Sequence, residues 1–416
     1  MPPTRRARRT RISPAAIAFR LAVYILTTWG TLELLSSGLF PGAQFVTLGL
    51  ALFSTIPIVA FALWRGWPFY PNAAFRLLVV RPFWYTQLLL PLVSAAGLLG
   101  LILGAPFGAA LLVGRIFAGT MLASTAVLLV LGYLGTRRLV VRRVDAEVPD
   151  LPPEFDGLRI VQLSDLHIGP HTNRRFLQRV VNATRSLQPD IIAVTGDLVD
   201  DRAEDVAAYV RALGSLEAPL GVYMIPGNHD VYAGWEEVEE SLRDAHLGTI
   251  LVNDVELVQR GGATLALVGT GDPAGGARGT SRAAPDVDRA LAGVPARATT
   301  IAFAHNPALW PALAARGVAL TLSGHTHWGQ FAVPKLGWSL ASPFLEHAMG
   351  AHAEKGSLLY ISPGTGYWGI PFRLGAPPEV TLVTLRRGDA AVARVHPASL
   401  VRRVRRARRG RPGRAA

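Results

Sequence analysis

Five short motifs in the later part of the chain combine carboxylate, imidazole and amide side chains at spacings that suit metal binding. They are Asp-x-His, Gly-Asp-x-x-Asp, Gly-Asn-His-Asp, a single His and Gly-His-x-His, and each directly follows an apolar run. Residues two apart in an extended chain point to the same side, so the pairs in the first and last motifs can each face one ion. The candidate ligands are Asp165, His167, Asp197, Asn228, His305, His325 and His327.

These seven side chains are too many for a single tetrahedral ion that keeps an open position. Imidazoles with carboxylates and an amide oxygen suit Mn, Fe, Zn, Co or Ni rather than a calcium cage. If Asp197 bridges, two divalent ions fit about 3.5–4 Å apart, each with three or four protein ligands. The excess positive charge of such a centre attracts an anionic phosphate ester and stabilises an in-line displacement.

The apolar runs that carry the motifs read as buried strands. They cover residues 158–164, 190–195, 221–225, 299–304 and 318–323, and helices are expected at 173–186, 203–216 and 235–245. Strand, polar turn and helix recur three times in succession, which predicts a parallel α/β core. In such sheets the carboxyl ends of the strands gather the chemistry at one edge. Further short strands are expected near 249–252, 255–259 and 263–268, and the glycine-rich residues 269–279 are expected to be a flexible connection.

The motifs resemble those of the calcineurin-like metallophosphoesterase superfamily, in the same order, between residues 158 and 327. The resemblance implies two packed mixed β-sheets flanked by helices, in four layers, α/β/β/α. It also implies two ligand sets that share Asp197: Asp165, His167, Asp197 and His327 for one metal, and Asp197, Asn228, His305 and His325 for the other. His229 is then a general acid rather than a ligand, and Asp165 lies within reach to orient it.

The segment that closes the domain looks like that of the membrane-associated branch of this superfamily, the YkuE and YaeI type phosphodiesterases. The similarity lies in residues 361–366, 371–373 and 377–380. It implies a diester or pyrophosphate substrate rather than a simple monoester.

Four apolar stretches precede the domain, at residues 16–35, 45–64, 85–103 and 116–134, in a chain that is 50% hydrophobic and 17% charged. Each approaches the ~20 residues that a helix needs to cross a bilayer. Arginines lie in the N-terminal arm, after the second stretch and after the fourth, which by the positive-inside rule places both termini and the domain in the cytoplasm. We therefore expect a multi-pass protein of the cell membrane, with a basic arm and four-helix region at 1–140, a linker at 141–153, the metallophosphoesterase domain at 154–396 and a basic disordered tail at 397–416.

The net charge of +13 comes entirely from the two ends of the 416-residue chain. The arginines concerned are Arg5, Arg6, Arg8, Arg9 and Arg11 in the arm, and Arg402, Arg403, Arg405, Arg406, Arg408, Arg409, Arg411 and Arg414 in the tail. Because the rest of the chain is formally neutral, no specific nucleic-acid binding is expected, and the tail is expected to lie on anionic lipid. The absence of cysteine excludes disulfides, thiolate metal sites and cysteine nucleophiles.

The function expected from these features is membrane-anchored phosphoester hydrolysis, in which a metal-bridging hydroxide attacks the phosphorus. A lipid-linked substrate such as UDP-2,3-diacylglucosamine or a phospholipid suits a membrane enzyme. Seven aromatic residues follow the last ligands and form either an apolar mouth for acyl chains or part of the core: Trp328, Phe331, Trp338, Phe344, Tyr367, Trp368 and Phe372. The alternative is a catalytically silent membrane scaffold with the same fold, against which His229 beside a complete ligand set argues.

Overall fold

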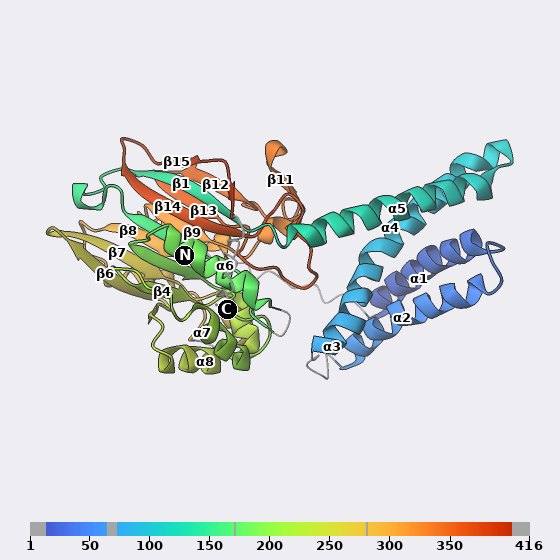
Figure 1. The fold of residues 1–416 in the computed structure, drawn as a ribbon, viewed down its shortest axis with the longest axis horizontal. Coiled ribbons are helices and arrows are strands. Elements are labelled where there is room, and N and C mark those ends of the chain that lie inside the picture. The colour runs from blue at the N-terminus through green and yellow to red at the C-terminus, as the bar shows by residue number, and fades with distance from the viewer. Residues whose placement is uncertain (1–13, 65–72, 170–171, 280–281, 402–416) are drawn as a thin grey trace, which may run out of the picture. The chain divides into compact units, whose positions relative to one another are not determined.

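The computed structural model describes residues 14–64, 73–169, 172–279 and 282–401. The chain forms two compact units, Met1–Val130 and Leu131–Ala416. The first unit is helical, and its last helix ends in the second unit (Figure 1). Its elements are α1 (Pro14–Ser36), α2 (Ala43–Trp64), α3 (Ala73–Phe75), a π-helical turn (Arg76–Val80), α4 (Arg81–Gly104), a 3-10 turn (Ala105–Phe107) and α5 (Ala110–Gly135).

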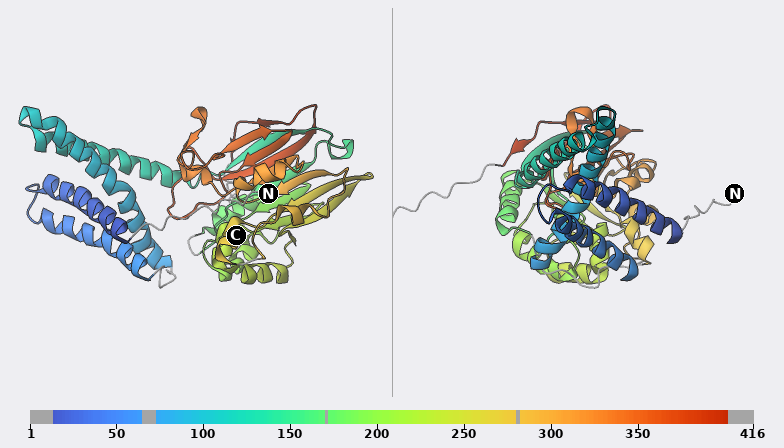
Figure 2. Two further views of the ribbon diagram at one scale, coloured as in Figure 1. Left: turned by 180° about the vertical axis from the view of Figure 1, so that it is seen from behind. Right: turned by 90° about the vertical axis from the view of Figure 1, so that its right-hand side faces the viewer.

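Helices thus occupy all four apolar stretches, and Figure 2 shows them from two further directions. Among the described residues, the helical segments Leu78–Phe107 and Ala110–Gly135 are long and apolar enough to cross a membrane. Polar side chains of the first unit bond between its helices: the Ser94 hydroxyl donates to the Thr28 carbonyl at 2.9 Å, and the Tyr24 hydroxyl to Gln87 Oε1 at 2.8 Å. Large apolar side chains such as Ile102 and Leu112 are exposed.

Two mixed β-sheets form the centre of the second unit. The first has the order β15-β1-β14-β2-β3-β4-β5, with β16 paired to β1, and the second has the order β12-β13-β9-β8-β7-β6. The first sheet comprises β1 (Val140–Val148), β2 (Arg159–Leu163), β3 (Ile191–Thr195), β4 (Val222–Ile225), β5 (Thr249–Ile250), β14 (Glu379–Arg387), β15 (Val392–Val395) and β16 (Ser399–Leu400). The second comprises β6 (Asp254–Arg260), β7 (Ala263–Gly269), β8 (Thr299–Phe303), β9 (Leu320–Ser323), β12 (Gly350–Glu354) and β13 (Ser357–Ile361). The predicted parallel core is confirmed, because β2, β3, β4 and β5 pair in parallel in that order.

Helices cover the outer faces of the sheets, and α6, α7 and α8 lie together along the first one (Figure 1). The helices are α6 (Arg174–Ser186), α7 (Val206–Leu213), α8 (Asn228–Asp244), α9 (Pro273–Arg278), α10 (Val287–Leu291) and α11 (Trp310–Ala314). Alternate residues of each strand enter different cores. Val161 packs with the helices, whereas its neighbour Ile160 packs between the sheets with Phe303 of the second sheet. On the far face Ala302 packs with Leu313, at the end of α11. The order of layers is therefore helix, sheet, sheet, helix.

The linker expected at 141–153 is wrong in its first half, because Val140–Val148 forms the nine-residue strand β1. Its four valines and Ala146 share the strand with Arg142, Arg143, Asp145 and Glu147, and β1 pairs in parallel with β14 from Val140↔Glu379 onward. Because four of these nine residues are charged, the sequence did not indicate a half-buried strand. The start of the expected tail is also folded, since Ser399–Leu400 pairs with β1. The arginines from Arg402 onward lie outside the described residues.

Candidate metal centre

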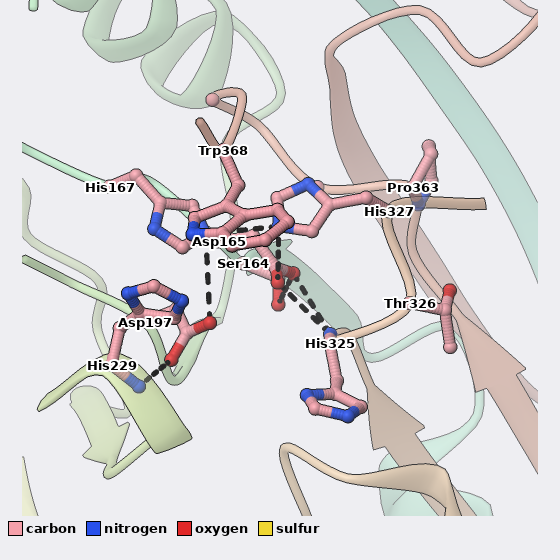
Figure 3. A network of polar contacts seen from close by, with 12 residues as sticks. Ser164, Asp165, His167, Asp197, His229, His325, Thr326, His327, Pro363 and Trp368 are labelled. Atoms are coloured by element: carbon pink, nitrogen blue, oxygen red, sulfur yellow. Dashed lines mark hydrogen bonds and ion pairs between the residues drawn. The ribbon is translucent and has the colours of Figure 1, made fainter. Parts of the chain in front are cut away.

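Four of the predicted ligands form one buried cluster at the carboxyl ends of three strands (Figure 3). Asp165 and His167 follow β2, Asp197 follows β3 and His327 follows β9. The ligand atoms of these four residues all lie within 4.8 Å of one another. His327 Nε2 is 2.9 Å from His167 Nε2 and 3.3 Å from Asp165 Oδ1, and His167 Nε2 is 3.6 Å from Asp197 Oδ2.

The other three predicted ligands surround the second side of Asp197. Asn228 begins α8 directly after β4, His305 follows β8 and His325 follows β9. Asn228 Oδ1 lies 2.7 Å from His325 Nδ1 and 3.2 Å from His305 Nε2. His305 Nε2 is also 3.2 Å from Asp197 Oδ2, the same oxygen that faces His167. The structure therefore brings all seven predicted side chains to one place, with Asp197 between the two groups.

These donor sets fit metal ions. Two ligands at the usual ~2.0–2.1 Å from one ion are separated by about 2.9–3.4 Å at angles of 90–110°, close to the separations found here. His305 Nδ1 donates to the Thr195 carbonyl at 2.8 Å, which points its Nε2 at Asp197 Oδ2, 3.2 Å away. Burial, and then the charge of His305, lower the pKa of His325 to about 4, so this imidazole is neutral and its lone pair is available. Burial, and then the guanidinium of Arg373, hold the pKa of His327 well below its ordinary value.

The backbone at the site is held in a conformation that side-chain-bearing residues seldom adopt. Five of the seven predicted ligands have left-handed φ angles: Asp165 (52°), His167 (44°), Asp197 (51°), His325 (68°) and His327 (48°). A non-glycine residue in this region is uncommon, and each costs of order 1–3 kcal/mol where it is strained. Because such strain gathers at functional sites, its concentration on these five residues supports the site independently of the motifs.

Two motif glycines are required by close approach. A Cβ on Gly227 would overlap the Asp197 carboxylate and backbone, and a Cβ on Gly324 would overlap the Ser164 hydroxyl and the Asp165 carboxylate. The glycines before Asn228 and His325 therefore allow the loops that carry the ligands to pack against the two carboxylates.

His229, the predicted general acid, lies beside the first cluster with its ring held by a main-chain atom. Its Nδ1 donates to the Asp200 carbonyl at 2.6 Å, and its amide donates to Asp197 Oδ1 at 2.8 Å. Its ring meets the ring of His167 edge-on at 4.7 Å and that of Trp368 at 5.8 Å (Figure 3). The orienting contact expected from Asp165 is thus made by Asp200, whose carboxylate also lies 3.5 Å from His167 Nδ1. A catalytic role for Asp165 stays a prediction.

Asp230 completes the central motif by joining two loops. Its carboxylate accepts the backbone N–H groups of Gly227 at 2.9 Å, Val199 at 3.0 Å and Leu198 at 3.3 Å. It therefore fixes the start of α8 against the loop after β3, so that Asn228 and Asp197 meet.

Comparison with known proteins places this geometry in a family. Residues 158–329 match the calcineurin-like phosphoesterase family. The uncharacterized metallophosphoesterase YkuE of Bacillus subtilis is 30% identical over 57% of this chain and 82% of its own length, and an uncharacterized metallophosphoesterase of Aquifex aeolicus is 30% identical over 61% and 94%. This chain belongs to the calcineurin-like metallophosphoesterase family. A transmembrane protein with metallophosphoesterase domain from Danio rerio is 34% identical over 65% of this chain, which covers 63% of that relative's length.

One residue of this metallophosphoesterase that sequence reasoning left without a role is Arg373, in the closing segment. Its side chain is 1% exposed, and its guanidinium donates to the carbonyls of His327 (3.1 Å), Pro363 (2.5 Å) and Gly366 (2.6 Å). Its Nη2 lies 2.8 Å from His327 Nδ1, opposite the nitrogen that faces the cluster. Burial lowers the pKa of Arg373 to about 10, which still leaves it charged. Arg373 therefore fixes both the backbone and the ring of a predicted ligand.

Replacing Arg373 is expected to weaken metal binding without a change in any predicted ligand. Partners of ligands in this position typically contribute 10–100-fold to metal affinity or activity, so Arg373→Ala should lose about that factor and Arg373→Lys less. Metal content at a fixed free Mn²⁺ concentration, with thermal unfolding measured in parallel, checks this. Arg316→Ala is the matched control, because Arg316 is an exposed arginine paired with Asp288. Wild-type metal content in folded Arg373→Ala would show that His327 is positioned without it.

Proposed function

We propose that this chain is a membrane-anchored phosphoesterase that uses two divalent metal ions held around Asp197. The observation that supports this best is the position of Asp197 Oδ2, 3.6 Å from His167 Nε2 and 3.2 Å from His305 Nε2, between two groups of donor atoms. Bound divalent ions supply Lewis acidity and lower the pKa of water, which is the chemistry that phosphoester hydrolysis requires. Because His229 Nδ1 donates to the Asp200 carbonyl, Nε2 is the nitrogen that gives a proton to the leaving oxygen, and the imidazolium form of the ring is the acid.

The proposed division of ligands follows the two groups, and the ions are of the Mn, Fe, Zn, Co or Ni class. Asp165, His167, Asp197 and His327 hold one ion, and Asp197, Asn228, His305 and His325 hold the other. In this arrangement the side chains around the two ions bind and orient an anionic ester. The Trp368 ring lies against one side of the His229 ring.

The membrane attachment consists of four crossings by α1, α2, α4 and α5, with both termini and the catalytic domain in the cytoplasm. Exposed leucines and isoleucines on α4 and α5, with hydrogen bonds that polar side chains of the first unit make between its helices, support burial in lipid rather than in water. The arginine distribution supports the orientation. The name of the Danio rerio relative, a transmembrane protein, agrees with a membrane location. We place the arginine tail on anionic lipid.

A lipid-linked diester or pyrophosphate is the proposed substrate class, such as UDP-2,3-diacylglucosamine or a phospholipid. The support is an exposed aromatic side chain next to the proposed acid. Trp368 is 50% exposed, and its ring centroid lies 5.8 Å from that of His229. Trp328, by contrast, is buried and donates to the Ile361 carbonyl, so it belongs to the core.

The test uses the full chain, because β1 lies before the expected domain boundary, reconstituted in nanodiscs. Metal is removed by chelation and then restored as Mn²⁺, and the substrates are bis-p-nitrophenyl phosphate, p-nitrophenyl phosphate and UDP-2,3-diacylglucosamine. Hydrolysis should depend on metal by at least about 10³-fold, because several kcal/mol of transition-state stabilisation comes from the ions. We expect the diester and the lipid-linked substrate to be cleaved faster than the monoester. Bound metal without turnover of any ester would instead favour the silent scaffold.

A further inference from the structure

A segment after the last predicted ligand exposes several large apolar side chains within a short stretch of sequence. Residues 331–345, here called the apolar hairpin, contain β10 (Ala332–Val333), the turn Pro334–Leu336 and β11 (Trp338–Ser339). Leu336 is 77% exposed and Phe344 is 81% exposed, and Val333, Trp338 and Leu340 are also exposed. Scattered exposed apolar residues are ordinary, but five within twelve positions mark an interaction surface.

The composition of the apolar hairpin is that of a segment at a lipid surface. Its single charged residue is Lys335, and it contains no Asp or Glu. Tryptophan, leucine, phenylalanine and lysine together are typical of segments that lie at the boundary between headgroups and acyl chains. The rings of Phe331 and Trp338 meet edge-on at 5.9 Å, and Trp338 remains 38% exposed.

The base of the hairpin is fixed to the residues that hold the end of α5. The Leu374 amide donates to the Gln330 carbonyl, and the Ala332 amide donates to the Leu374 carbonyl, both at 2.9 Å. One residue earlier, the Arg373 amide donates to the Gly132 carbonyl of α5 at 2.9 Å. A Cβ on Gly132 would overlap the ring of Phe372. Because residues 131–135 belong to the second unit, this connection is internal to that unit.

The same end of α5 carries groups that suit anionic headgroups. Tyr133 is exposed in the last turn, and Arg137 and Arg138 follow it on the surface. The Arg137 guanidinium donates to the Tyr133 hydroxyl at 2.8 Å and lies 4.8 Å from the centre of its ring. Aromatic residues with arginines at the end of an apolar helix mark the level at which the helix leaves the bilayer.

We propose that the apolar hairpin is a second membrane contact of the domain, which inserts into the cytoplasmic headgroup region of the bilayer that α5 crosses. The occupant of this surface is lipid, for two reasons. Leu374, which holds the base of the hairpin, directly follows Arg373, which holds the end of α5. The hairpin also carries a lysine but no acidic residue. The proposal rests on the proposed membrane attachment, whereas it does not require hydrolysis. Gln330, the residue before the hairpin, also holds Trp368: its Nε2 donates to the Trp368 carbonyl at 3.0 Å, and its Oε1 accepts the Trp368 amide at 3.1 Å.

The test uses single cysteines, since the natural chain has none. Leu336→Cys, Phe344→Cys and Leu257→Cys are each labelled with an environment-sensitive fluorophore in the full chain, in nanodiscs of phosphatidylethanolamine and phosphatidylglycerol. Leu257 is the matched control: it is 39% exposed on β6, at the opposite edge of the second sheet from β12, into which the hairpin leads. Labels at 336 and 344 should emit at shorter wavelength and be quenched by brominated acyl chains, at depths of roughly 5–10 Å below the headgroups. The label at 257 should be quenched only by iodide in water.

Two outcomes would overturn the proposal. Labels at 336 and 344 that behave like the label at 257 would show a hairpin in water. Labels that emit at shorter wavelength but escape the brominated lipids would show that protein covers the hairpin. Hydrolysis of bis-p-nitrophenyl phosphate by Leu336→Ser/Phe344→Ser is measured alongside. If hydrolysis is retained but the labels at 336 and 344 are not quenched by lipid, this inference fails and the proposed function stands. If those labels are quenched by lipid in a chain that cleaves no ester, the proposed function fails and this inference stands.

Discussion

Asp197→Asn is expected to bind less than one metal ion per chain and to lower kcat/KM for bis-p-nitrophenyl phosphate by on the order of 10³, because loss of the ions removes several kcal/mol of stabilisation. The reason is the position of the carboxylate between the two donor groups, 3.6 Å from His167 Nε2 and 3.2 Å from His305 Nε2. Asparagine has the same shape and keeps one oxygen for the His229 amide, so the local fold is retained while the negative charge is lost.

The measurement is metal content by mass spectrometry on the full chain, with kinetics and thermal unfolding on the same preparation. Asp244→Asn serves as the control, since Asp244 is an exposed aspartate at the end of α8. If Asp197→Asn kept two ions with wild-type affinity, the proposed sharing of Asp197 would be wrong.

His229→Gln is expected to keep both metal ions and to lose rate in a way that depends on the leaving group. General acid catalysis contributes about 10²–10⁴-fold, and it is needed most when the leaving oxygen is a strong base. The loss should therefore be large for a phenyl or alkyl diester and smaller for bis-p-nitrophenyl phosphate, whose leaving group departs without a proton. The structure supports this separation of roles, because His229 is held through Nδ1 by the Asp200 carbonyl and flanks the donor cluster.

The assay for His229→Gln compares kcat for a series of diesters with leaving groups of different pKa, together with metal content. His246→Gln, at an exposed histidine just beyond α8, is the control. An equal loss for every leaving group would exclude proton donation by His229, and an empty metal site would exclude its assignment as a non-ligand.

Much of the site could be predicted because its signals are local. Each predicted ligand follows a short apolar strand, and parallel strands bring their carboxyl ends to one edge whatever the details of packing. Asp165, Asp197 and His305 therefore meet in the structure although 140 residues separate the first from the last. The helix expected at 173–186 is found at Arg174–Ser186, where Asn173 caps it by accepting the Arg175 amide at 2.8 Å.

What could not be predicted depends on distant or main-chain partners. Strand β1 has a charged outer face, and the reason for its burial lies in β14, more than 200 residues later. Asp200 holds His229 through its main-chain carbonyl, and a pattern of side chains cannot predict such a contact. The available signal was that Asp200 is the second aspartate of the Gly-Asp-x-x-Asp motif. The segment 269–279 was expected to be flexible, yet Pro273–Arg278 is helical because Asp272 accepts the Ala274 amide at its start.

The pairing of β1 bears on how the domain is assembled during synthesis. Its strand partners β14, β15 and β16 all lie between Glu379 and Leu400. At roughly 5–20 residues per second, β1 leaves the ribosome some 10–50 s before the first of them exists. During that interval it is an open strand edge next to a helix that has already been made, and such edges attract other chains. A chain that stalls or is cut before Glu379 never covers this edge, so loss of a short C-terminal piece exposes the chain to aggregation and proteolysis even though every metal ligand is present.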